Sequence, residues 1–142
     1  MNTINFIKTY TNKIILNDKE NIYITMEEYL NKVLLNQLTT LKGRLDAIKK
    51  LYGFRKLVPL YITNTLILFP INNLKDYENI YINAVNIIDI YKHGSKTVIE
   101  FQGSTKLCVN KNCSQVIKYY ERALSINHNS WFFLQKVVKY EM

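Results

Sequence analysis

The first third of the chain changes from the two-residue period of strands to the longer period of helices. Residues 13–16 and 22–25 are rich in β-branched side chains and flank the turn-like residues 17–21, which predicts an N-terminal hairpin. Thr25 begins a capping-box sequence, and the apolar residues after it recur at helical spacing. We therefore expect a first helix that ends near Gln37.

A second helix is expected from about Gly43, after a break at Thr39 and Thr40, and Gly53 suits its C-terminal cap. Its apolar side consists of Leu45, Ile48, Leu51 and Tyr52. Its polar side consists of Lys42, Asp46, Lys49 and Lys50. Arg44 lies nearer the apolar side, so it can reach a ligand only from the first turn of the helix or from the preceding loop.

From residue 57 onward the apolar positions follow the period of strands. The predicted strands are residues 57–62, 66–69, 80–82, 87–91, 97–101 and 105–109. Turn residues at 63–65, 93–95 and 103–104 join neighbouring strands, and Pro70 ends the first pair. This pattern predicts an antiparallel meander.

Two helices are expected after the strands. Asn112 can cap the first, whose apolar stripe consists of Cys113, Val116, Ile117, Tyr120, Ala123 and Leu124. The last begins near Ser130, and residues 131–138 are apolar on too many sides for a monomer's surface helix, which indicates a core or an oligomer interface. The predicted fold class is α+β: an antiparallel β meander with an N-terminal hairpin, a basic helix and two C-terminal amphipathic helices.

Composition favours one folded domain over residues 1–142, because 48% of the residues are hydrophobic and there are only four glycines and two prolines. The N-terminus lacks the layout of a signal peptide, and the longest apolar stretch, near residues 66–71, is too short to span a bilayer. We expect a cytoplasmic protein with no membrane partner. Cys108 and Cys113 fit neither a zinc site nor a disulfide framework, which favours inert packing roles.

Positive charge is concentrated in one short segment. The chain carries 19 lysines and arginines against 11 acidic residues, a net charge of +8, and residues 42–56 hold six of the basic residues against Asp46 alone. Residues 1–41 and 57–110 are each balanced, with four charges of either sign. Acidic residues normally intersperse on a solvated helix face, so the surplus favours a polyanion partner over a merely solvated face.

Catalytic motifs are absent from the sequence. The only histidines, His93 and His128, fall in a predicted hairpin turn and an inter-helix loop, and neither has a catalytic partner that the sequence indicates. There is no glycine-rich phosphate loop, no H-E-x-x-H and no paired carboxylate motif. We expect a binding protein rather than an enzyme, with no cofactor and no metal.

Short motifs between Leu35 and Leu124 follow one another in a specific order. They are Thr39-Thr40-Leu41-Lys42-Gly43-Arg44, Ala47-Ile48-Lys49, Val58-Pro59-Leu60, Leu68-Phe69-Pro70 and Glu78-Asn79-Ile80-Tyr81-Ile82-Asn83. In order and spacing they resemble the ComK family, the transcription activators that switch on competence, the uptake of DNA, in Gram-positive bacteria. Three positions depart from the family pattern: Leu38 replaces a glycine, Ile71 a threonine and Tyr81 a tryptophan.

The resemblance implies binding to AT-rich double-stranded DNA through the minor groove, with bending, by a homo-oligomer associated with the nucleoid. RNA polymerase is a candidate further partner. Minor-groove readers insert Arg or Lys into a narrow, negative groove, and Arg44, flanked by Thr39, Thr40 and Gly43, suits that insertion. A competing interpretation is that Arg44 only packs its stem against the helix.

Further residues are candidates for contacts to DNA. Those expected to contact phosphates are Lys42, Lys49, Lys50, Arg55 and Lys56. Asn72 and Asn73 are further candidates, although turn formation is the commoner role of paired asparagines.

Two other functions remain open at this stage. An RNA-binding module would also be basic and rich in tyrosine, but the sequence lacks an RNP-type run. A protein-interaction factor would use the aromatic residues near the C-terminus to hold a partner, and its positive charge would be incidental. The second alternative predicts no salt-dependent affinity for DNA.

Overall fold

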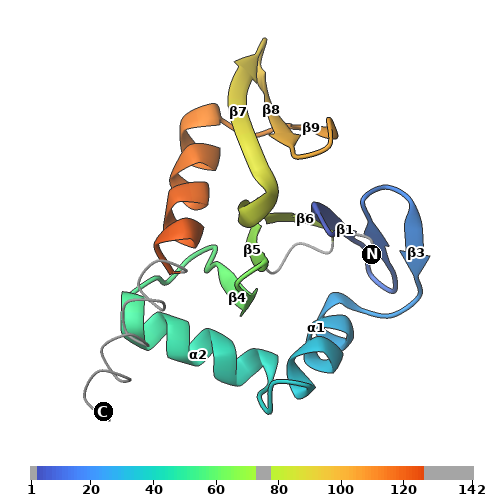
Figure 1. The fold of residues 1–142 in the computed structure, drawn as a ribbon, viewed down its shortest axis with the longest axis vertical. Helices are drawn as coiled ribbons and strands as arrows, with labels where there is room; N and C mark the ends of the chain where they lie inside the picture. The colour runs from blue at the N-terminus through green and yellow to red at the C-terminus, as the bar shows by residue number, and fades with distance from the viewer. Residues whose placement is uncertain (1–2, 73–77, 127–142) are drawn as a thin grey trace.

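The computed structural model describes residues 3–72 and 78–126, which form two antiparallel sheets and three α-helices (Figure 1). The strands are β1 (Phe6–Thr9), β2 (Ile14–Leu16), β3 (Glu20–Ile22), β4 (Leu60–Thr63), β5 (Leu66–Pro70), β6 (Asn79–Asn83), β7 (Ile87–His93), β8 (Lys96–Phe101) and β9 (Lys106–Val109). The helices are α1 (Met26–Leu35), α2 (Leu41–Tyr52), the short 3-10 helix η1 (Ala84–Asn86) and a C-terminal helix over residues 113–126.

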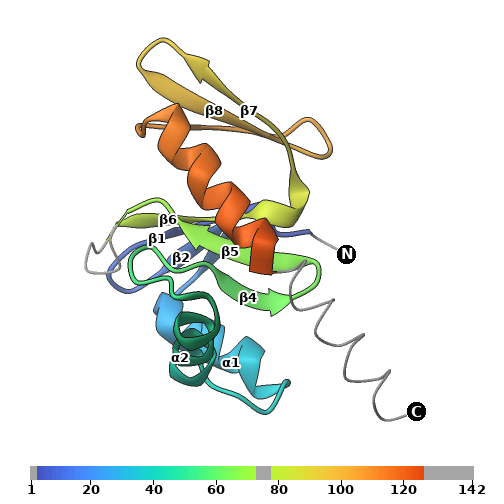
Figure 2. The ribbon, with the colours of Figure 1, turned by 90° about the vertical axis from the view of Figure 1, so that its left-hand side faces the viewer.

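The six-stranded sheet, in the order β3-β2-β1-β6-β5-β4, forms the middle layer of the molecule. Figure 2 shows α1 and α2 on one side of it, and the helix of residues 113–126 with strands β7 and β8 on the other. The three-stranded sheet has the order β7-β8-β9, and η1 connects β6 to it. Helix α2 therefore lies on the side of the main sheet opposite the second sheet.

Both faces of the main sheet are covered by apolar side chains. In β1, Phe6 joins the cluster beneath the second sheet, whereas Ile7 joins the cluster beneath α1. In β5, Ile67 and Phe69 join the first of these clusters and Leu68 joins the second. This alternation is the two-residue period of a strand buried on both faces.

Much of the predicted secondary structure is confirmed. Thr25 caps α1, its Oγ1 accepting a hydrogen bond from the Glu28 amide at 3.1 Å, and Gly53 ends α2 in the left-handed conformation with φ 73°. The hairpins β4–β5, β7–β8 and β8–β9 form with the predicted turns. The α+β class with antiparallel sheets is therefore as expected.

Other expectations about the strands and helices are wrong. The strands after residue 57 do not form one meander, because β6 pairs with β1 and β5 while β7 begins a separate sheet. The partner of β2 in the predicted hairpin is Glu20–Ile22 rather than residues 22–25, since Thr25 is needed as the helix cap. Leu51 is 76% exposed instead of lying on the buried side of α2, because Ile48 is the residue of α2 that packs in the interior. The helix predicted from Ser130 lies outside the described residues.

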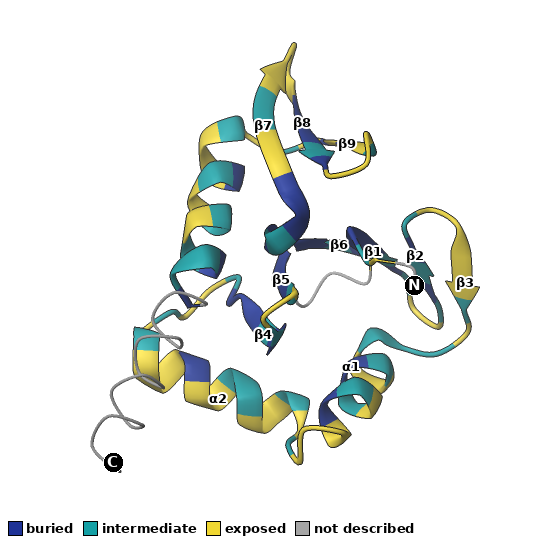
Figure 3. Ribbon diagram, viewed as in Figure 1, coloured by how far each residue is buried: buried dark blue, intermediate teal, exposed yellow. Residues whose placement is uncertain are grey.

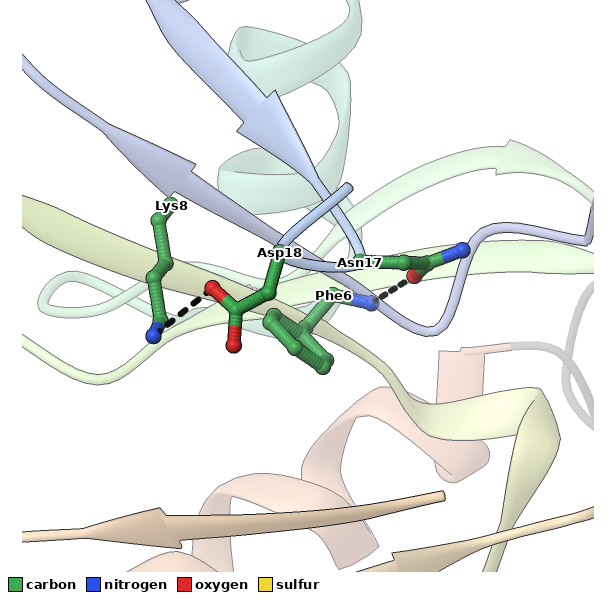
Figure 4. A network of polar contacts seen from close by, with 4 residues as sticks. All are labelled: Phe6, Lys8, Asn17 and Asp18. Carbon is green, nitrogen blue, oxygen red and sulfur yellow. Dashed lines mark hydrogen bonds and ion pairs between the residues drawn. The ribbon is translucent and has the colours of Figure 1, made fainter. Parts of the chain in front are cut away.

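The first strand was missed by the sequence pattern and is tied down by Asn17. The Asn17 Oδ1 accepts hydrogen bonds from the amides of Asn5 and Phe6 at 2.8 and 3.2 Å, and its Nδ2 donates to the Thr3 carbonyl. The next residue, Asp18, pairs with Lys8 at 2.8 Å (Figure 4). Both turn residues adopt positive φ, which asparagine and aspartate tolerate better than most residues. The β2–β3 turn thus fixes the start of β1.

Candidate nucleic-acid interface

Helix α2 begins with a compact cap made by two threonines and a glycine. The Thr40 Oγ1 accepts a hydrogen bond from the Gly43 amide at 3.1 Å, which satisfies one of the free amides at the helix start. A Cβ at Gly43 would lie 3.3 Å from the Thr40 Oγ1 and 3.4 Å from the Thr39 Oγ1. The glycine therefore lets the two hydroxyls approach the first turn, which gives this motif a structural use beside any contact with a ligand.

The turn between α1 and α2 holds a leucine where a glycine is usual. The Thr39 amide bonds to the Leu34 carbonyl at 3.3 Å and the Leu38 amide to the Leu35 carbonyl at 3.0 Å, the pair of bonds that defines a Schellman motif. Leu38 occupies its left-handed position with φ 61°. That conformation costs a non-glycine residue about 1–2 kcal/mol. This is why glycine is common at such a position, and Leu38 is also 96% exposed.

Arg44 is held by the protein itself. Its Nη2 donates a hydrogen bond to the Gln37 Oε1 at 2.7 Å, and the Gln37 Nε2 donates to the Ile62 carbonyl at 2.6 Å. The guanidinium Cζ also lies 5.9 Å from the centre of the Tyr61 ring. This chain of contacts ties the start of α2 to the α1–α2 turn and to β4. Arg44 as a whole is half-buried.

The lysines and arginines expected to contact phosphates are exposed and have no acidic partner in the described part of the chain. We call them the basic face: Lys42, Lys49, Lys50, Arg55 and Lys56. Among residues 3–72 and 78–126, ion pairs join Lys8 to Asp18 and Lys106 to Glu100, and none involves the basic face. Figure 3 shows α2 exposed along its outer side.

The positive charge is strongest at the C-terminal end of α2. A groove of about 690 Å³ between α1 and α2 contains Lys42 and Lys49 but also Glu27 and Asp46, so it is mixed in charge. A second hollow, of about 390 Å³, is lined by Lys49, Lys50, Gly53, Phe54 and Arg55 and by no acidic residue. Lysines in a last turn also offset the helix dipole, but that does not explain Arg55, which follows the helix.

Arg122 joins this end of α2 and was not among the predicted site residues. Its guanidinium Cζ lies 4.3 Å from the centre of the Phe54 ring, and its Nη2 donates to the Lys56 carbonyl at 3.2 Å. Burial lowers the pKa of Arg122 from its ordinary value. The helix of residues 113–126 places Arg122 next to Lys56, which lies 66 positions earlier in the sequence. No local sequence signal indicates this proximity.

Asn72 belongs to another part of the molecule. Its backbone amide and carbonyl bond to the Asn79 side chain, each at 3.0 Å, which agrees with a turn role for this residue. It lines a hollow with Lys8, Thr9, Tyr10, Glu78, Asn79 and Ile80, none of which belongs to α2. The structure thus separates Asn72 from the basic face, and Asn73 lies outside the described residues.

The motif at residues 78–83 forms part of the interior. Asn83 is 1% exposed, and its side chain bonds to the amides of Ile67 and Val85 and to the carbonyls of Ile4 and Thr65. These four bonds connect β5 and β6 with the segment before β1. Burial raises the pKa of Tyr81 to about 12. The polar groups of this motif therefore hold the fold together.

Cysteine, metal and membrane features add no further site to the described residues. Cys108 is exposed on β9, which corrects the expectation that it packs in the interior, because it points away from the face formed by Leu107 and Val109. In residues 3–72 and 78–126 no group of three potential metal ligands occurs. No helix there is long and apolar enough to cross a membrane.

The described residues thus form an α+β fold with exposed basic residues gathered at the C-terminal end of α2. Comparison with known proteins gives one match to a family model, described as ComK protein, over residues 2–130. No curated protein and no solved structure matches the chain. Because the model covers most of the chain, this protein belongs to the ComK family. It is a competence-related transcription factor whose partner is DNA, and the family is not one of enzymes.

Proposed function

We propose that this protein binds AT-rich double-stranded DNA through the minor groove and contacts the backbone with the basic face. The observation that carries the proposal is the concentration of five exposed basic residues without acidic partners around α2 in the described structure. Phosphate contacts supply most of the affinity of such an interface and fix its position. Arg122 lies beside Lys56 and extends the positive surface.

Arg44 is proposed to read the width of the groove, and its geometry supports a defined test. A guanidinium is less strongly hydrated than an ammonium, so it enters a narrow AT-rich groove at a lower desolvation cost. Its bond to Gln37 uses one of five donors and orients the rest. Thr39, Thr40 and Gly43 would bring the backbone close to a phosphate at the start of α2.

The wider assembly is part of the same proposal. We expect a homo-oligomer on repeated runs of A and T, since residues 131–138 carry more apolar side chains than one surface helix needs. Those residues lie outside the described part of the chain. We further propose that the protein acts in the cytoplasm, associated with the nucleoid, and that RNA polymerase is a further partner. Sedimentation with and without DNA tests the oligomer.

The test is binding to matched AT-rich and GC-rich duplexes, with a minor-groove drug as competitor. We expect tighter binding to the AT-rich duplex and displacement by the drug. Arg44→Lys should reduce the AT preference by about 1–3 kcal/mol while leaving affinity for GC-rich DNA nearly unchanged. Gln37→Ala removes the bond that orients Arg44 but keeps the guanidinium, so it should reduce the AT preference less than Arg44→Lys does. An unchanged preference in a folded Arg44→Lys protein would remove Arg44 from the site.

A further inference from the structure

Leu38 combines two features that are unfavourable in an isolated folded protein. Its backbone is left-handed, with φ 61°, and its side chain is 96% exposed, the largest exposure among the exposed large hydrophobic residues of the described structure. A glycine would relieve the strain and remove the exposed apolar group. Strained residues held by surrounding bonds concentrate at sites of function, and two bonds of the Schellman motif hold this one.

The α1–α2 turn projects from the molecule. Figures 1 and 2 both show it beyond the ends of α1 and α2, and Figure 3 shows it exposed. Thr40 and Lys42, which follow within four residues, are exposed as well. An apolar tip thus stands next to hydroxyl and ammonium groups that suit a phosphate backbone.

We propose that Leu38 is a wedge that inserts between two base pairs from the minor groove and kinks the DNA. The inference rests on the proposed function, because it needs the side of the molecule that carries α2 and the α1–α2 turn to face a duplex. Apolar side chains inserted between base steps unstack them and bend the helix toward the major groove, and leucine is among the residues that do so. The neighbouring positive charges hold the backbone while the side chain enters.

Backbone hydrogen bonds hold Leu38 in place despite its unfavourable conformation. The 6→1 bond from Thr39 to Leu34 and the 5→2 bond from Leu38 to Leu35 fix the turn, so the side chain is presented from a rigid end of α1. Flexible TA steps, which unstack at low cost, occur in AT-rich DNA, so the wedge and the proposed groove preference favour the same sites.

The experiment uses an AT-rich duplex with one central TA step in which 2-aminopurine replaces the adenine, so that unstacking raises fluorescence. The full chain should raise the fluorescence on binding. Leu38→Asn, a polar residue that tolerates the left-handed conformation, should reduce that rise at least about fivefold while changing affinity by no more than about tenfold, because phosphate contacts remain. Leu38→Met keeps an apolar tip and should keep the signal.

Ile88→Thr is the control for loss of an exposed apolar residue, since Ile88 is 58% exposed on β7 in the other sheet. It should leave the signal unchanged. An equal rise with Leu38→Asn, or binding of the unaltered chain without any rise, would overturn the wedge and leave the proposed function standing. Failure of the unaltered chain to bind this AT-rich duplex would overturn both the wedge and the proposed function. If Leu38→Asn raises the 2-aminopurine fluorescence as much as the unaltered chain but no longer binds a protein that the unaltered chain binds, the leucine belongs to a protein interface instead.

Discussion

Two stretches of this protein, residues 78–83 and residues 42–56, use their polar side chains in opposite ways. In residues 78–83, Asn79 and Asn83 are buried and bonded to backbone groups of other segments. In residues 42–56, the lysines of α2 are exposed and have no ion-pair partner in the described structure. Polar side chains that are buried and hydrogen-bonded within the protein explain its fold. Exposed charges without an ion-pair partner in the described structure indicate what the protein binds.

Loss of the Asn83 side chain should produce the largest effect on stability. Asn83→Ala leaves the amides of Ile67 and Val85 and the Thr65 carbonyl without the partner that the asparagine supplies, whereas the Ile4 carbonyl keeps a bond from Asn86. Each unsatisfied buried group costs about 1–3 kcal/mol, and the bonds to Val85 and Thr65 are only partly buried, so the cost lies at the low end. We expect the free energy of unfolding to fall by roughly 3–4 kcal/mol, measured by urea denaturation. Asn21→Ala, at an exposed position of β3, is the control. A loss below that of the control would show that the buried network does not hold the fold.

Charge reversal at the end of α2 should have the opposite profile. Lys49→Glu with Lys50→Glu should weaken binding to AT-rich and GC-rich DNA alike by about a hundredfold, with little change in melting temperature, because phosphate contacts carry little sequence information. Lys92→Glu with Lys96→Glu, on exposed positions of β7 and β8, makes the same change in net charge elsewhere. Equal weakening by both pairs would reduce the basic face to a net-charge effect.

Alkaline pH should affect the buried stretch through Tyr81. Because burial raises the pKa of folded Tyr81 from 10.0 to about 12, its contribution to stability is fully present below pH 10 and is lost as the pH rises from about 10 to 12. The free energy of unfolding should fall by roughly 2 kcal/mol over that window. Tyr81→Phe should flatten this part of the curve of stability against pH. A curve that Tyr81→Phe does not change would contradict the assignment.

The smallest expected effect is a gain in stability at the α1–α2 turn. Leu38→Gly removes the cost of a left-handed leucine, and the side chain is too exposed to lose packing, so the protein should be more stable by about 1 kcal/mol. Leu57, which also has positive φ at 49° but is partly buried, offers the comparison. Leu57→Gly should gain less because it also removes packed apolar area, and thermal unfolding measures both.

The parts of the fold that could be predicted are those with local signals. Thr25 and Gly53 mark helix ends through their own backbone and side-chain chemistry, and the turns of the hairpins are equally local. Phe6–Thr9 gave no such signal, because a central strand covered on both faces lacks a simple alternation of apolar and polar residues. The division of the strands into two sheets depends on pairing between distant segments.

The candidate site shows the same limit. The surplus of charge in residues 42–56 is visible in the sequence, as is the angular position of Arg44. The bonds from Arg44 to Gln37 and from Arg122 to the Lys56 carbonyl depend on tertiary packing, and so does the separation of Asn72 from α2. Local sequence indicates a charged helix, but only the fold shows which charges the protein leaves for a partner.

The central claim is that the basic face binds the DNA backbone, and the dependence of duplex affinity on salt tests it most directly. The six positive charges of the basic face and of Arg44 in the groove, which release about as many counterions from the duplex, predict a slope of about −5 for the logarithm of the binding constant against that of salt concentration. The double reversal at Lys49 and Lys50 should reduce the steepness to between about −3 and −4. An affinity of the unaltered chain that does not change with salt would contradict the account.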